Sequence, residues 1–150
     1  MSSSIIALRD LFERDLDKVL NELKSYKKEE NLWIVDDEIT NSGGNLMLHI
    51  CGNLRHFIVS MLGGSSYIRQ RDDEFNLRDV KKSGIVDLIK QTKKAVLETL
   101  NELEEEKLDE IYPVNVFGKE MTTQFFLFHL YGHLNYHLGQ INYHRRLLDK

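Results

Sequence analysis

The chain has 150 residues, of which 41% are hydrophobic and 29% charged, a composition typical of one folded domain and unlike that of a disordered chain. Its 20 lysines and arginines against 24 acidic residues give a net charge of -4, which argues against nucleic acid as a main partner. No stretch approaches the roughly 18 apolar residues of a membrane-spanning helix, and the single cysteine, Cys51, excludes an intrachain disulfide or a thiolate metal cluster.

The first half of the chain predicts two helices. Apolar residues recur at steps of three and four from Ile5 to Tyr26, which indicates an amphipathic helix. A loop follows, anchored by Trp33. Helical spacing returns from Asn45 to Leu62 and stops at the glycine pair 63–64.

The second half predicts two more helices. Residues 65–82 are crowded with charge and predict a long surface loop, in which Arg69 and Arg71 balance neighbouring acids. Ser83 is expected to cap a helix that runs to residue 103, and the segment 111–119 predicts a short hairpin or extended crossing. A last helix is expected over 122–148. We therefore expect a single all-α domain over residues 1–150, a four-helix bundle with long connecting loops and either up-down or crossover connectivity.

All six histidines fall on the second and fourth predicted helices. On the fourth, His129, His133 and His137 are spaced four apart, so that successive side chains rotate by only about 40° and neighbours can share one ion. Zinc and nickel accept neutral imidazole nitrogen, and copper and iron do so as well. His49 lies beside the apolar stripe of the second helix and can supply a third ligand. The predicted metal ligands are His49, His133 and His137.

The competing interpretation is a layer of hydrogen-bonded aromatic and imidazole rings inside the bundle. His129 fits the same spacing but lies a turn earlier, and we expect it beside the metal ligands rather than among them. Asn53 and Gln140 are candidates to orient ligands or water. Cys51 is rotated by about 200° from His49 and is expected to be a buried structural thiol.

Two other histidines receive non-metal roles. His56 lies two turns beyond His49, roughly 10 Å along the helix, which suits a core or interface position. His144, with the arginines at 145 and 146, falls near the C-terminal end of the last helix, where cations stabilise the helix dipole.

The segments HLYGHLNYHLGQI (129–141) and LMLHICGNLRHF (46–57) resemble the DinB and YfiT-like superfamily of metal-binding bundles. The most specific piece is the HxxxHxGQ pattern that begins at His133. The resemblance implies a four-helix bundle, often dimeric, whose metal is held by one histidine of the second helix and an HxxxH pair of the last helix. It places these roles on His49, His133 and His137, and it implies a homodimer here.

Three functional hypotheses follow. Three neutral imidazoles leave an ion its positive charge and an open coordination position, which suits an enzyme that activates a low-molecular-weight thiol, as some members of that superfamily do. The second hypothesis is metal-dependent hydrolysis, weakened because no acidic residue lies between Met121 and Arg146. The third is a non-enzymatic, stress-associated dimeric module. Zinc or nickel is the expected ion, a thiol or other small molecule the expected ligand, and the cytoplasm the expected compartment because the first residues lack a basic signal region.

Overall fold

The computed structural model describes residues 1–150 and is all-α. Its long helices are α1 (Ser3–Ser25), α2 (Gly43–Leu54), α4 (Lys82–Glu102) and α5 (Thr123–Leu148). The π-helical turn η2 (Arg55–Ser60) continues α2 without a break, and the short helices are η1 (Glu29–Trp33), α3 (Arg71–Asn76) and η3 (Glu105–Leu108). The predicted all-α bundle is therefore confirmed. No helix has the length and apolar character needed to cross a membrane.

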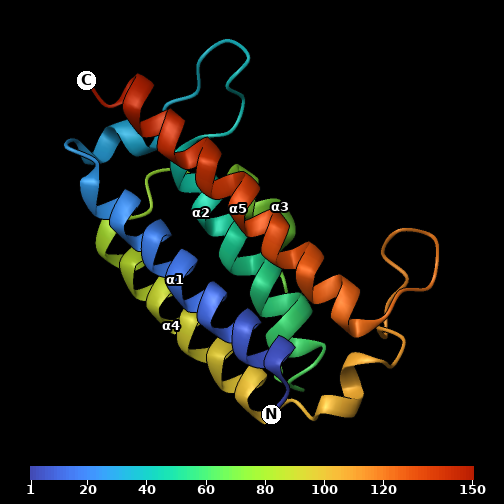
Figure 1. Ribbon diagram of the computed structural model, residues 1–150. Helices are drawn as coiled ribbons and strands as arrows, with labels where there is room; N and C mark the ends of the chain where they lie inside the picture. Colours follow the sequence, from blue (N-terminus) through green and yellow to red (C-terminus); the bar gives the residue numbers. More distant parts are fainter.

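The four long helices pack as two antiparallel pairs, α1 with α4 and α2 with α5 (Figure 1). Asp17 pairs with Lys93 and Arg9 bonds to Asn101, so α4 runs opposite to α1. Asp15 bonds to Tyr131 and Glu22 pairs with Arg145 further along both helices, so α1 and α5 run parallel. Because α2 and α4 then also run in one direction, the chain between them must return along the bundle. The connectivity is a crossover, and the returning segment carries α3 along α2.

The core follows from the apolar spacing of each helix. On α1 the side chains that recur at three- and four-residue steps are all fully buried, namely Ile5, Leu8, Phe12, Leu16, Val19 and Leu23. Hydroxyl side chains start three of the long helices, because Ser2, Ser42 and Thr122 each accept a backbone N–H three residues on. The caps fix where these helices start, and the buried apolar side chains fix how they are rotated. Together they determine which polar side chains of α2 and α5 face each other.

Several details differ from the sequence prediction. The expected surface loop 65–82 contains the helix α3, and Ser83 caps nothing, because α4 starts after Lys81 without a side-chain cap. The expected hairpin reduces to a single bridge between Ile111 and Thr122.

The loop before α2 is anchored by Trp33, as expected, through a close contact with the helix backbone. The indole packs against Gly44, where a Cβ atom would come within 2.8 Å of the ring. Any larger residue would push the tryptophan out, so glycine lets the loop and the first turn of α2 lie together.

Candidate metal centre

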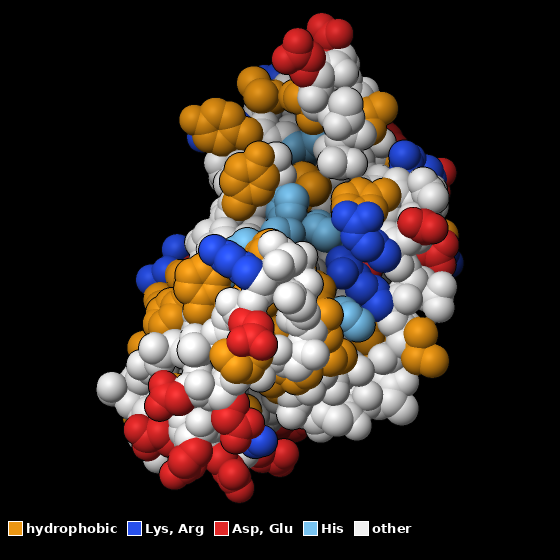
Figure 2. Space-filling model, turned by 90° about the vertical axis from the view of Figure 1, so that its right-hand side faces the viewer, with side chains coloured by type: hydrophobic (Ala, Val, Ile, Leu, Met, Phe, Trp, Pro, Cys, Tyr) orange, Lys and Arg blue, Asp and Glu red, His pale blue; other side chains and the backbone are white.

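Three imidazoles from two antiparallel helices meet at one point. Nε2 of His133 lies 3.2 Å from Nε2 of His49 and 3.1 Å from Nε2 of His137. His49 is buried on α2, and the other two are half-buried one turn apart on α5. Figure 2 shows histidine side chains at the floor of a surface hollow, with Lys and Arg side chains on one side of it. The structure thus brings together the three residues predicted as ligands.

The spacing of these nitrogens suits a divalent ion. Ligand atoms of the three histidines all lie within 4.8 Å of one another. With metal–nitrogen bonds of about 2.0–2.1 Å, two ligands of a tetrahedral ion lie about 3.3 Å apart and adjacent ligands of an octahedral ion about 3.0 Å apart. The two measured separations match these values, so the group could hold a metal through three nitrogens.

The other ring nitrogens of two histidines are held by protein acceptors. Nδ1 of His49 donates to Oε1 of Glu74 at 3.0 Å, and Nδ1 of His137 donates to Oε1 of Gln140 at 2.7 Å. These bonds place the proton on Nδ1 and leave the Nε2 lone pair free for an ion. Gln140 therefore orients a histidine, one of the roles suggested for it.

Glu74 is held as firmly as the histidine that it orients. Its two carboxylate oxygens accept hydrogen bonds of 2.9 Å from the guanidinium of Arg69, and both side chains are largely buried. Burial alone would raise the pKa of Glu74, but the hydrogen bonds from His49 and Arg69 outweigh it and lower the pKa below its ordinary value. A Cβ atom on Gly52 would come within 1.9 Å of Oε2, so the carboxylate depends on glycine at position 52.

His133 and His137 are neutral in the folded chain. Burial, followed by the repulsion that protonated His137 and His49 rings would exert, lowers the pKa of His133 to about 3. Burial also lowers the pKa of His137, against the opposing hydrogen bond to Gln140. Neutral imidazole is the form that binds a metal, so no proton has to leave these rings at neutral pH.

The two arginines of the predicted solvated loop behave differently from each other. Arg69 is not solvated, because its guanidinium forms an ion pair with Glu74 inside the site. Arg71 is exposed and stacks over the ring of Phe75, with 5.1 Å from its Cζ to the ring centroid. Phe75 in turn lies against His49, with ring centroids 4.7 Å apart. Arg71 thus places a charge without an acidic partner at the edge of the site.

The histidines assigned to other roles lie outside the three-nitrogen group. His129 is exposed, stacks on Phe126 and meets the edge of Phe117. His56 is half-buried against the ring of Phe57. Both rings therefore pack against aromatic side chains and take no part in the three-nitrogen group.

The assignment of His144 to helix-end stabilisation was wrong. It is buried, with Nδ1 accepting from the hydroxyl of Tyr26 at 2.6 Å and Nε2 donating to the carbonyl of Ile34 at 2.8 Å. Burial lowers its pKa, so it carries no positive charge for the helix dipole. Cys51 is a buried thiol, as expected, and burial raises its pKa to about 12.

Glu74 is the residue that sequence analysis missed. It sits 25 positions from His49 in a charged segment that gave no helical or motif signal. The only available hint was that basic residues at 69 and 71 are followed by acidic residues at 72–74, a pattern that fits a solvated loop equally well. Its role depends on the crossover that lays α3 along α2.

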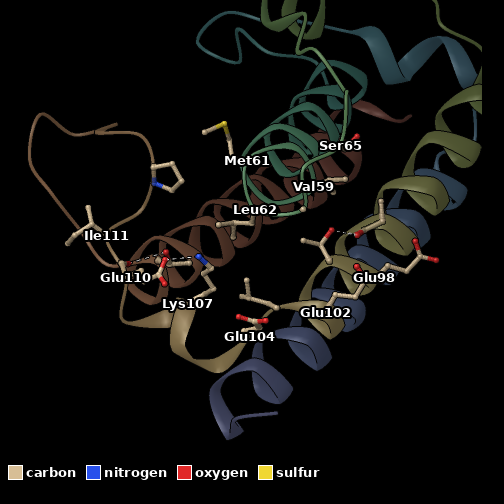
Figure 3. A pocket seen from close by; sticks show the side chains of 16 residues that line it. Val59, Met61, Leu62, Ser65, Glu98, Glu102, Glu104, Lys107, Glu110 and Ile111 are labelled. Carbon is tan, nitrogen blue, oxygen red and sulfur yellow. Dashed lines mark hydrogen bonds and ion pairs between the residues drawn. The ribbon is translucent and has the colours of Figure 1, made fainter.

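A separate cavity lies elsewhere. It has a volume of about 510 Å³ and opens between η2, the end of α4 and the residues around η3. Figure 3 shows its lining, where Glu98, Glu102 and Glu104 face an apolar side formed by Val59 and Leu62. None of the six histidines lines it, so the cavity and the histidine group are separate features.

Comparisons with known proteins agree with this fold. A conserved protein from Enterococcus faecalis has a similar structure, with a TM-score of 0.80 at 15% identity over 99% of this chain and 98% of that one. A DinB-like protein from Bacillus cereus ATCC 10987 gives 0.69 at 20% identity over 88% and 84%. At these identities the likeness shows the fold alone, a helical bundle like that of the DinB-like protein.

No curated protein matches this chain. The family model described as "Protein of unknown function (DUF1572)" matches residues 3–150, nearly the full length. The chain therefore belongs to the DUF1572 family.

Proposed function

We propose that this protein binds one divalent transition metal through His49, His133 and His137 and uses it to activate a low-molecular-weight thiol. The observation that carries the proposal is the convergence of three Nε2 atoms. Nε2 of His133 lies 3.2 Å from that of His49 and 3.1 Å from that of His137, and the Nδ1 atoms of the latter two rings are hydrogen-bonded to Glu74 and Gln140. Zinc or nickel suits three imidazoles. Three protein ligands leave a coordination position for a small molecule.

The surroundings favour a thiol over water as the nucleophile. Metal-dependent hydrolases commonly place a carboxylate or histidine where it accepts a proton from the attacking water. Glu74 is the only carboxylate in contact with the three histidines, and its oxygens are occupied by His49 and Arg69. A thiol depends less on such a base, because its ordinary pKa of about 8.5 is already far below that of water and a bound divalent ion lowers it further. The free charge of Arg71 suits a thiol that also carries an acidic group.

The proposed reaction is a thiol transfer. The S–H bond of the thiol breaks and its proton goes to solvent. The sulfur electron pair then forms a bond to an electrophilic carbon of the second substrate, and the leaving group departs with the electron pair of the bond that breaks. The protein's own residues hold the ion, exclude part of the solvent and orient the imidazoles.

Cobalt-loaded protein provides the test. A thiolate bound to cobalt adds a sulfur-to-metal charge-transfer band that nitrogen and oxygen ligands do not give. We expect this band when the protein is titrated with cysteine-derived thiols such as glutathione or bacillithiol. The titration is repeated in Cys51→Ser, which removes the only internal sulfur. If no thiol produces the band, thiol activation is wrong and the metal has another use.

A second candidate is a non-enzymatic, stress-associated dimeric module whose metal stabilises the bundle. The exposed face of α5 favours a dimer, because it presents a row of large apolar side chains, namely Phe125, Phe128, Tyr136, Tyr143 and Leu147. We expect a homodimer in light scattering at micromolar concentration, and a shift towards monomer in Tyr136→Glu. A wild-type protein that is monomeric throughout would contradict the dimer.

A further inference from the structure

Asn53 is a buried polar residue of α2 that lacks a hydrogen-bond partner. The residue is only 7% exposed, and the carboxamide oxygen Oδ1 bonds to no group of the protein. Buried polar atoms in folded proteins almost always have a hydrogen-bond partner. An unpaired one loses its hydrogen bonds to water without replacement, which destabilises the folded state. An exception in a polar site points to a ligand that completes the pairing.

One other buried side-chain oxygen shares this property, the hydroxyl of Thr92 on α4. Thr92 is completely buried between α4 and α2, and the nearby thiol of Cys51 is a weak partner for it. Its position is therefore explained within the core. No interaction of this kind is found for Oδ1 of Asn53, and this contrast makes Thr92 a matched control.

The position of Asn53 connects it to the histidine group. It follows His49 by one helical turn, so the two side chains leave α2 within about 40° of each other and about 6 Å apart along its axis. The Arg69 guanidinium spans the same stretch on one side, 3.4 Å from the His49 ring and 5.8 Å from the ring centroid of Phe57. On the other side α5 approaches, where Phe126 meets Phe57. The helical spacing thus places Asn53 one turn from His49 on the side of α2 that faces α5.

We propose that the Asn53 carboxamide accepts a hydrogen bond from the thiol ligand whose sulfur occupies the open metal position, an inference that rests on the proposed function. Laid end to end, a metal–sulfur bond of about 2.3 Å, the three bonds of an S–C–C–N unit and a hydrogen bond of about 2.9 Å exceed the one-turn separation of about 6 Å, so a ligand that bends can bridge it. A donor N–H three bonds from the sulfur is therefore sufficient, and a longer spacer is not needed. The ligand class that meets this requirement is a 2-amidoethanethiol, the unit shared by cysteine-derived and pantetheine-type thiols.

Two probes that differ in one N–H group test this assignment. N-acetylcysteamine carries the amide donor, and 2-mercaptoethyl acetate replaces it by an ester oxygen that cannot donate. Both are titrated into cobalt-loaded full-length protein, with the charge-transfer band as the readout. We expect wild type to bind the amide at least about fivefold more tightly than the ester. This ratio of dissociation constants corresponds to the loss of one buried hydrogen bond.

The variant Asn53→Leu keeps the side-chain volume and removes the acceptor. We expect it to retain its cobalt, to bind the ester as wild type does, and to lose the preference for the amide. Its midpoint of urea unfolding should be equal to or higher than that of wild type, because an unpaired polar atom has been replaced by an apolar one. Asn53→Ala gives a second reading should the leucine pack poorly, and Thr92→Val should keep the full preference.

The outcomes separate the two proposals. If wild type gives no band with either probe, thiol activation fails and the role of Asn53 fails with it. If the band forms equally with amide and ester, or the preference survives in both Asn53 variants, thiol activation stands and the Asn53 assignment is wrong. Loss of cobalt from Asn53→Leu would place Asn53 in the metal cradle and also overturn it. Tighter binding of N-acetylcysteine than of N-acetylcysteamine identifies a cysteine-derived ligand, and equal binding a pantetheine-type one.

Discussion

Helix α5 takes part in two buried histidine clusters, and they differ in whether their hydrogen bonds are complete. At His144 both ring nitrogens have protein partners, the Tyr26 hydroxyl and the Ile34 carbonyl. At His133 the Nε2 atom faces two other Nε2 atoms, and no protein acceptor meets Nδ1. A buried imidazole with complete bonding stabilises the fold, whereas three converging Nε2 atoms form a group that a divalent ion could complete. The bonding of each ring, more than its burial, separates structure from chemistry.

The largest effect is expected when the cluster of His49, His133 and His137 is disrupted. His133 is the central ring, within 3.2 Å of both others, so His133→Ala should lower bound metal from about one ion per chain to nearly none. Elemental analysis after mild metal loading and dialysis measures it, and His144→Gln should keep the wild-type metal content. Equal metal in wild type and His133→Ala would show that these histidines are not the ligands.

The support of His49 can be removed without touching a ligand. In Gly52→Ala the new Cβ would clash with Oε2 of Glu74, so the carboxylate must leave Nδ1 of His49. We expect metal affinity to fall about 10- to 100-fold, the usual effect of losing such a hydrogen bond, and Glu74→Ala should match it. Gly132→Ala is the control, because nothing lies within 4 Å of its Cβ position. Unchanged affinity in Gly52→Ala would make Glu74 irrelevant to the metal.

The comparison of Glu74 with the three histidines shows how far the sequence could be read. His133 and His137 share one helix, so their spacing alone predicted that the two rings meet. His49 needed the further assumption that the second helix faces the last one, which its apolar neighbours supported. Glu74 could not be found, because its position depends on the crossover connection, a choice that local periodicity leaves open. The partners of His144 are also tertiary, at 118 and 110 positions away.

Acid should affect the metal-free protein through the histidine group. The folded pKa of His133, about 3, lies below the unfolded value near 6.5, so the unfolded chain binds more protons between these values. Stability is therefore complete above pH 6.5 and is lost as the pH falls towards 3, by up to about 1.4 kcal/mol per pH unit for this one ring. Urea unfolding at several pH values should show a shallower slope in His133→Phe than in wild type or in the surface variant Tyr136→Phe. An identical slope would contradict the lowered pKa.

The smallest effect is expected in the cluster around His144, whose two ring nitrogens both have protein partners. Tyr26→Phe removes one hydroxyl and leaves Nδ1 of His144 unpaired, which should lower the free energy of unfolding by about 1–2 kcal/mol. Metal content should not change, because this cluster takes no part in the metal site. Urea denaturation and elemental analysis of the same preparation test both statements. A loss of metal in Tyr26→Phe would mean that the two clusters are coupled through α5.

The pairing of α2 with α5 also has a consequence for the time at which an ion can be acquired. His49 and His133 are separated by 84 positions, so ribosomes working at about 5–20 residues per second make them roughly 4–17 s apart. During that interval the emerging chain offers His49 alone, and the HxxxH pair then appears before it has a helix to dock against. An ion held by all three histidines, as we propose, would therefore load only after α5 has docked. The cation would then be set by the ions available around the folded protein at that moment, more than by the nascent chain.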